Sequence, residues 1–210
     1  MIMPLLKQSF FCLLFLSLCF SYAMAAEIEG VDKNKPFPAK KNFYWSQGHF
    51  DWYYSTYQEP PWVNKADAIK LFQHAADTWK ACGVQITFKG VIETPVRQQD
   101  RQNVMGWRQL SLPIRALTLR QSKFQGEELL EVDVIVNIIN KDIQNDPRLL
   151  QKVVDHEFGH ALGLIHSEGC SDVMSSASEC GARIADPPPT SVTEKDLAQC
   201  RLRYPPQPIF

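Results

Sequence analysis

A group of three histidines constrains this chain more than any other sequence feature. Three of the five histidines in the 210 residues lie between positions 156 and 166. His156 and His160 are four residues apart, so on a helix both imidazoles project from one face. Asp146-Pro147 is a helix start signal and Gly163 is a stop signal, which predicts one helix between them. The fold must therefore place two imidazoles side by side on that helix.

A third histidine and a glutamate complete this arrangement. Gly163 lets the chain leave the helix with a positive φ, so that His166 can return to the two helical imidazoles. Three imidazoles form a ligand set of catalytic zinc sites, which keep a fourth position open for water. We expect one zinc ion bound by His156, His160 and His166. Glu157 is then the expected general base, which takes a proton from water as it attacks a carbonyl.

A second interpretation gives the same histidines a structural use. A zinc ion could stabilise a module that binds protein partners without cleaving them. Glu157 discriminates between the two interpretations, because a pure binding module does not need a carboxylate beside a zinc ligand. The sequence therefore favours an enzyme that hydrolyses its substrate with a zinc-activated water, with the binding module as the alternative.

The first 25 residues are typical of a secretory signal peptide. They contain Lys7, an uncharged run from Phe10 to Phe20, and a small-residue cleavage site that ends at Ala25. An uncleaved membrane anchor is the alternative, since residues 9–26 approach the length of a minimal span. We expect cleavage, a secreted protein in the extracellular space or the periplasm, and no stable membrane association afterwards.

The rest of the chain has the composition of one globular domain, with 45% hydrophobic and 21% charged residues. Lysines and prolines in residues 26–49 suit an N-terminal extension, and residues 50–210 are predicted to form the catalytic domain. Lys and Arg number 22 against 23 Asp and Glu, which leaves no excess of cations to bind nucleic acid. We therefore expect no nucleic-acid partner, and we expect a monomer.

Hydrophobic periodicity predicts strands and helices along this domain. Apolar residues recur at spacings of three and four between Asn64 and Gly83, which indicates an amphipathic helix. Strands are predicted at 52–57, 84–88, 103–107, 114–120 and 131–138. His49 and His74 are predicted to be ordinary surface residues.

Four cysteines follow the predicted signal peptide, at positions 82, 170, 180 and 200. An even number in an exported chain predicts two disulfides, for which three pairings are possible. Cys170 and Cys180 flank one loop, so we favour Cys170–Cys180 together with Cys82–Cys200. A cysteine zinc site is the alternative, but the chain contains no C-x-x-C pair to support it.

The segment from His156 to His166 resembles the zinc signature of the metzincin endopeptidases. It satisfies H-E-x-x-H-x-x-G-x-x-H at every fixed position, and Met174 follows eight residues after His166, as in the methionine turn of matrixins. The resemblance extends over about residues 50–205, where the chain is similar to short bacterial matrixins. It implies an α+β, zincin-like fold, with a mixed, twisted sheet of about five strands. An active-site helix, a backing helix and a C-terminal helix from about Thr193 would accompany the sheet.

The resemblance also implies a zinc-dependent endopeptidase that hydrolyses the peptide bonds of a polypeptide substrate. It implies roles for single residues as well. Met174 would form the floor beneath the zinc site, and the substrate would lie extended along an edge strand, for which residues 114–120 are the candidate. Astacin-like metzincins link the region after the first helix to the last helix, which supports Cys82–Cys200. Only 22 residues separate Asp133 from His156, too few for the long loop that holds a structural zinc and calcium in animal matrixins. No structural zinc is therefore predicted, and the sequence makes no prediction for calcium.

Overall fold

The computed structural model describes residues 43–123, 127–167, 170–176, 180 and 191–204. All of them belong to one unit of the chain, Pro38–Phe210. The predicted signal peptide (1–25) and most of the predicted extension (26–42) lie outside the described residues. Among the described helices, none is both long and apolar enough to cross a membrane.

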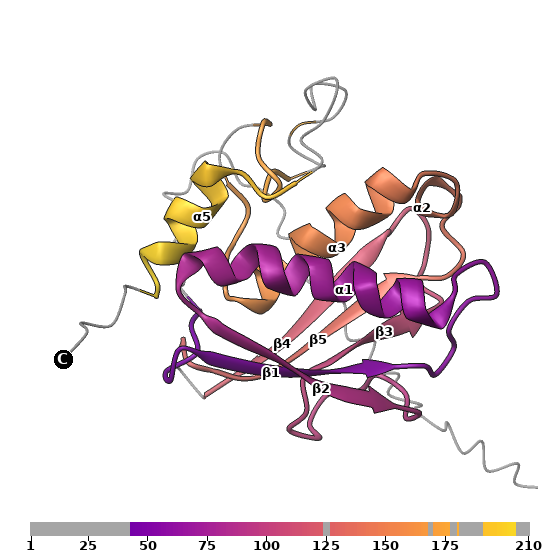
Figure 1. Cartoon of the computed structure of the whole chain (residues 1–210), viewed down its shortest axis with the longest axis horizontal. Coiled ribbons are helices and arrows are strands. Elements are labelled where there is room, and N and C mark those ends of the chain that lie inside the picture. Colours follow the sequence, from indigo (N-terminus) through magenta and orange to yellow (C-terminus); the bar gives the residue numbers. More distant parts are fainter. Residues whose placement is uncertain (1–42, 124–126, 168–169, 177–179, 181–190, 205–210) are drawn as a thin grey trace, which may run out of the picture. The chain divides into compact units, whose positions relative to one another are not determined.

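Five strands form one mixed sheet (Figure 1). The strands are β1 (His49–Ser55), β2 (Gln85–Ile92), β3 (Val104–Arg108), β4 (Ala116–Ser122) and β5 (Leu129–Asn137). Their order is β2-β1-β3-β5-β4. β4 runs antiparallel to β5, and the other neighbouring pairs are parallel. β2 and β4 are therefore the two edges of this sheet.

The helices begin at residues that can cap them. They are α1 (Lys65–Trp79) with the 3₁₀ turn η1 (Lys80–Cys82), α2 (Lys141–Asn145), α3 (Pro147–Ala161) and α5 (Glu194–Arg201). The side chains of Asn64, Asp146 and Thr193 accept backbone N–H groups at the starts of α1, α3 and α5. These three helices confirm the sequence-based predictions. The five-residue α2 is too short for periodicity to reveal it.

Helices α1 and α3 cover one face of the sheet (Figure 1). Phe50, Trp52 and Tyr54 alternate along β1 and are completely buried on this face. The ring of Phe158, on α3, meets Phe50 and Trp52 edge-on, at centroid distances of 6.2 and 5.8 Å. Because aromatic side chains bury the largest apolar areas, these contacts hold α3 against the sheet.

A smaller apolar cluster lies on the opposite face of the sheet. Val96, from the connection between β2 and β3, packs there with Val104 and Ile135. Alternation along β5 puts Asp133 on the same face as Ile135, and its side chain is completely buried. The sheet therefore carries a buried carboxyl group on the face opposite to the one that α1 and α3 cover.

Residues 43–49, which the sequence analysis assigns to the N-terminal extension, lie in the same unit as the rest of the described domain. The indole nitrogen of Trp45 donates to the backbone oxygen of Ala161 at 2.9 Å. Its backbone N–H donates to the hydroxyl of Tyr204 at 3.0 Å. The lysine- and proline-rich composition ends at Lys41. Of the aromatic residues that follow, Trp45 is buried in the core and Phe43 packs against it, whereas Tyr44 is exposed.

Two disulfides connect segments of the domain. Cys82 of η1 is bonded to Cys200 of α5, and Cys170 is bonded to Cys180. This is the pairing that the sequence analysis favours. The first bond ties the end of α1 to α5 across a sequence separation of 118 residues.

Candidate metal centre

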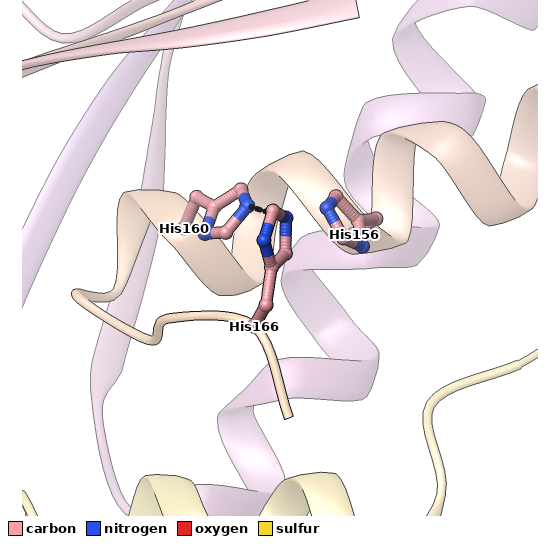
Figure 2. Close-up of side chains that lie close together, drawn as sticks. All are labelled: His156, His160 and His166. Carbon is pink, nitrogen blue, oxygen red and sulfur yellow. Dashed lines mark hydrogen bonds between the residues drawn. The ribbon is translucent and has the colours of Figure 1, made fainter. Parts of the chain in front are cut away.

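The three histidines converge at the carboxyl-terminal half of α3 (Figure 2). His156 and His160 project from successive turns of the helix, and His166 returns from the loop that follows it. One ligand atom from each lies within 4.8 Å of the other two. The structure thus brings together all three predicted zinc ligands. His49 instead pairs with Asp51 on β1 at 2.6 Å, and His74 is exposed on α1.

Backbone carbonyl groups determine which nitrogen of each helical imidazole faces the centre. Nδ1 of His156 lies 2.7 Å from the oxygen of Val173, and Nδ1 of His160 lies 2.8 Å from that of Leu164. Because a carbonyl oxygen can only accept, each Nδ1 carries the proton and each Nε2 presents a lone pair. Such a carbonyl contact orients a metal-binding imidazole and sets its tautomer.

Burial keeps the two helical imidazoles neutral. It lowers the pKa of His156, and it lowers the pKa of His160 well below the ordinary value, with the charge of His156 acting in the same direction. A metal ion binds only the deprotonated nitrogen of imidazole. The protein environment therefore prepares both side chains for a metal ion rather than for a proton.

The donor set fits zinc. Nε2 of His160 and Nε2 of His166 are 3.3 Å apart. Two nitrogens bound to one tetrahedral zinc ion at about 2.0–2.1 Å are separated by roughly the same distance, ~3.3 Å. Two lone pairs that face each other at this distance repel unless a cation or a proton lies between them. Three imidazoles also leave the fourth position that catalytic zinc sites use.

Glu157 is held beside the histidines by the edge strand. Its side chain is 8% exposed, and the hydroxyl of Thr118 on β4 donates to its Oε2 at 2.5 Å. Burial raises the pKa of Glu157 to about 7, against the opposing effects of the Thr118 hydrogen bond and of the charges of His166 and Arg120. A carboxyl group with a pKa near neutrality can both accept and return a proton.

Met174 lies beneath α3, as the resemblance implies. It is completely buried. A Cβ atom at Gly159 would lie 2.3 Å from the sulfur of Met174 and 2.8 Å from Cζ2 of Trp79. Only glycine at this position therefore lets the methionine pack against the turn that joins His156 to His160.

Gly163 ends the helix and redirects the chain. Its φ of +87° is the left-handed conformation that favours glycine. A Cβ atom here would also lie 2.1 Å from the backbone oxygen of Phe43. The turn delivers Leu164, whose carbonyl orients His160, and then His166 itself. The role predicted for Gly163 is thus consistent with both its backbone conformation and its packing.

Two residues that support the site carry no sequence motif. Thr118 reaches Glu157 from β4, and Asp196 of α5 binds the loop beneath His156. The Asp196 carboxylate accepts the backbone N–H groups of Val173 and Met174, each at 3.1 Å. Asp196 also forms a capping box with Thr193 at the start of α5. No local sequence signal reveals that Asp196 binds this loop or that Thr118 faces Glu157.

The three clustered histidines do not line either of two cavities of the described domain, although His74 lines the first of them. One cavity of about 610 Å³ lies between α1 and the start of α3, where Trp62, Leu71 and Leu150 are among its walls. A neighbouring cavity of about 540 Å³ shares Trp62 with it. His166 is instead exposed on the surface of the domain. This position suits the binding of an extended chain better than the enclosure of a small molecule.

Comparisons with known proteins give a structural likeness only. No family model matches the chain, and no curated protein matches it. Among the solved structures that match is a chain of the GM1-bound form of the ECX AB5 holotoxin. The two are 14% identical with a TM-score of 0.51, over 75% of this chain and 80% of that chain. At this identity the likeness concerns the fold alone.

This likeness corrects the predicted fold class. The resemblance to metzincins implies an α+β, zincin-like fold, whereas the fold is that of a chain of an AB5 holotoxin, with a mixed five-stranded sheet and helices. The physical reason is that the motif specifies one helix, one turn and three ligands. It does not specify the sheet that surrounds them. The geometry of the three histidines does not depend on the fold class.

Proposed function

We propose that this protein is a zinc-dependent endopeptidase. The observation that carries the proposal is the convergence of three imidazoles on one point, with a buried carboxyl group beside them on the next residue of the same helix. The resemblance of His156–His166 to the metzincin zinc signature supports the same activity. The proposed ligands are His156, His160 and His166, for one catalytic zinc ion.

Glu157 acts as the general base in the proposed reaction. A zinc ion at the histidines supplies a Lewis acid that lowers the pKa of water toward about 7 and polarises the scissile carbonyl. Glu157 takes a proton from the water as the water oxygen bonds to the carbonyl carbon. The proton then passes to the amine nitrogen as the carbon–nitrogen bond breaks. Water is thereby added across the peptide bond.

Thr118 orients this base. Its hydroxyl holds Oε2 of Glu157, so the other carboxylate oxygen is left to accept the proton of the water. A donor to the charged form of a carboxyl group also opposes the effect of burial on its pKa. Thr118 is therefore a positioning residue in the proposed mechanism.

The substrate is proposed to be a polypeptide that pairs with β4. This strand is an edge of the described sheet and has β5 as its only neighbour within it. The N–H and C=O groups on its other side can pair with an extended peptide. Because Thr118 lies in the same strand as these groups, a bound peptide would pass directly beside Glu157.

The proposal places the protein outside the cytoplasm. Two disulfides are present in the described domain, and such bonds persist in oxidising compartments. Together with the predicted signal peptide, they support an extracellular or periplasmic location.

The proposal is tested by comparing the purified protein with its Glu157→Ala variant. Zinc content is measured by mass spectrometry, and cleavage is measured with unfolded casein. We expect about one zinc ion per chain in both proteins and cleavage by the unsubstituted protein alone. A chelator should abolish this cleavage, and zinc should restore it. If both proteins bind zinc and neither cleaves any peptide of a broad library, the zinc-stabilised binding module is the correct interpretation.

A further inference from the structure

Two arginines near β4 differ in how their charges are compensated. Arg115, just before the strand, has a buried Nε without an acceptor but donates through Nη2 to the carboxylate of Asp142 at 2.8 Å. Arg120, inside the strand, forms no side-chain hydrogen bond or ion pair among the described residues, and its Nη1 is buried without an acceptor. A partly buried guanidinium whose Nη1 lacks an acceptor is costly, even with the charge of Glu157 acting on it. Its retention beside a candidate site suggests that a ligand supplies the missing acceptor.

Arg120 lies next to the metal centre. It follows Thr118 by two residues on the same strand, so both side chains point to the same face. Thr118 contacts Glu157 directly. The positive charge of Arg120 also acts on Glu157 and on His160, and it lowers the pKa of each.

The guanidinium is fixed in place by an aromatic ring. The central carbon of the Arg120 guanidinium lies 4.7 Å from the ring centroid of Phe43, a cation–π contact. Phe43 is itself packed against Gly163 at the end of α3. Arg203 adds a second positive charge that acts on Arg120. The result is a positioned cation that need not break an existing ion pair when it binds an anion.

We propose that Arg120 recognises a carboxylate of the polypeptide substrate, supplied by an aspartate or glutamate residue that lies along β4. This inference rests on the proposed endopeptidase function and names the class of substrate. Arg120 is only partly buried, so a side chain that follows the edge strand can reach it. A carboxylate would accept charge-assisted hydrogen bonds and neutralise the cation, which the amide of glutamine cannot do equally well.

The test is a scan with matched peptides. A peptide that the protein cuts in casein is synthesised with glutamate or glutamine at each of the three positions on either side of the cleaved bond. The quantity measured is the ratio of kcat/KM for the glutamate peptide to that for the glutamine peptide. Because both peptides meet the same catalytic centre, this ratio cancels any effect of a substitution on Glu157.

We expect a ratio of about 10 to 100 at one of these positions. The ratio should fall to about one in Arg120→Gln and be partly kept in Arg120→Lys. Arg115→Gln is the matched control, since it removes a neighbouring cation that already has a carboxylate partner, and it should keep the full ratio. A ratio near one at every position, or an unchanged ratio in Arg120→Gln, overturns the proposal.

A binding measurement separates this inference from the proposed function. Fluorescein-labelled peptides of both series are titrated with the zinc-loaded Glu157→Ala protein and with its Arg120→Gln derivative, and anisotropy gives each Kd. We expect the glutamate peptide to bind about 10-fold or more tightly than the glutamine peptide, but only when Arg120 is present. Equal Kd values refute the role of Arg120, whereas carboxylate-dependent binding together with cleavage that a chelator does not abolish refutes only the zinc-dependent peptidase.

Discussion

Two buried carboxyl groups on opposite faces of the sheet have different surroundings. Asp133 projects from β5 on the face away from α1 and α3, and Glu157 lies on α3 over the other face. Burial is the largest cause of a raised pKa in both, to about 8 for Asp133 and to about 7 for Glu157. Burial alone therefore does not distinguish a candidate catalytic group from a structural one.

The described neighbours of Asp133 include no cluster of potential metal ligands. Its Oδ1 accepts the backbone N–H of Val104 at 3.1 Å. Its Oδ2 is buried without a hydrogen-bond partner in the described domain. The negative charges of Glu131 and Asp100 raise its pKa further, and the positive charge of Arg108 opposes them more weakly. Asp133 is thus a carboxyl group among other carboxyl groups, and it anchors the start of β3.

The neighbours of Glu157 are of the opposite kind. A hydroxyl group donates to one of its oxygens, and the charges of His166 and Arg120 favour its ionised form. Three potential metal ligands lie beside it on the same helix and the loop that follows. The comparison teaches that the groups facing a buried carboxyl group, more than its pKa, indicate whether it can take part in a reaction.

The most direct way to break this comparison is to make the same amide substitution at both carboxyl groups. Glu157→Gln should lower kcat for casein peptides by about 10²–10⁴-fold, because the general base is lost. Asp133→Asn is the isosteric control and should leave kcat within about twofold. Zinc content is measured for both variants, and we expect it to be unchanged. Equal losses of activity would show that the two groups do not differ as described.

Part of the dependence of stability on pH should be attributable to Asp133, beside smaller contributions of the same sign from Asp155 and Glu157. The pKa of Asp133 in the folded state, about 8, exceeds the unfolded value of about 3.9, so folding favours its protonated form. This contribution is fully present below about pH 4 and is lost as the pH rises toward 8. The unfolding free energy should therefore fall by roughly 3–5 kcal/mol over this range because of Asp133.

Urea denaturation of the unsubstituted protein and of Asp133→Asn at pH 4.5, 6 and 8 measures this effect. The variant should lack this part of the decline, because its amide does not ionise, and it should be the more stable protein at pH 8. Parallel curves for the two proteins would show that Asp133 does not carry the effect.

Two tightly packed glycines, one near each of the two buried carboxyl groups, allow the two faces of the sheet to be compared by matched substitutions. A Cβ atom at Gly159 would meet the sulfur of Met174 at 2.3 Å, and one at Gly106 would meet Cγ2 of Val96 at 2.8 Å. Each substitution by alanine should lower the free energy of unfolding by about 1–3 kcal/mol, because both sites are overpacked. Only Gly159→Ala should also weaken zinc binding, measured by competition with a chromogenic chelator. Equal zinc affinity in both variants would argue against Met174 as the floor of the site.

The smallest expected effect concerns the donor to Glu157. Thr118→Val removes the hydroxyl with little change of shape, and it leaves one oxygen of Glu157 without a donor, as Oδ2 of Asp133 is now. We expect kcat to fall about 10-fold, the value of one hydrogen bond to a charged group, with little change in KM. Thr118→Ser should restore kcat because it restores the donor. A loss in KM alone would mean that Thr118 serves peptide binding rather than the base.

Local parts of the fold and of the site could be predicted from the sequence. The helix between Asp146 and Gly163 depends on its own cap, its period and its stop, so α3 and the convergence of His156 with His160 follow from short-range rules. Alternation likewise located all five strands to within a few residues. β1 begins earlier than expected because alternation already starts at Phe50.

Contacts between distant segments could not be predicted. Thr118 is 39 residues from Glu157, and a single sequence does not show which strand faces which helix. The same applies to Trp45, whose partner Ala161 is 116 residues away, and hence to the boundary of the domain. The fold class failed for a related reason, since an eleven-residue motif does not determine the order of five strands.

The contacts of α5 determine when the site can be completed during folding. Asp196 supplies the acceptors for the loop that carries Val173 and Met174, and Tyr204 donates its hydroxyl to the carbonyl of Leu162 at the end of α3. A ribosome adds residues from the amino end at about 5–20 per second, so the histidines emerge before the groups that support them. A growing chain therefore stays without its finished centre until residues 193–204 have docked. During its synthesis the proposed peptidase therefore lacks the contacts that complete its histidine site.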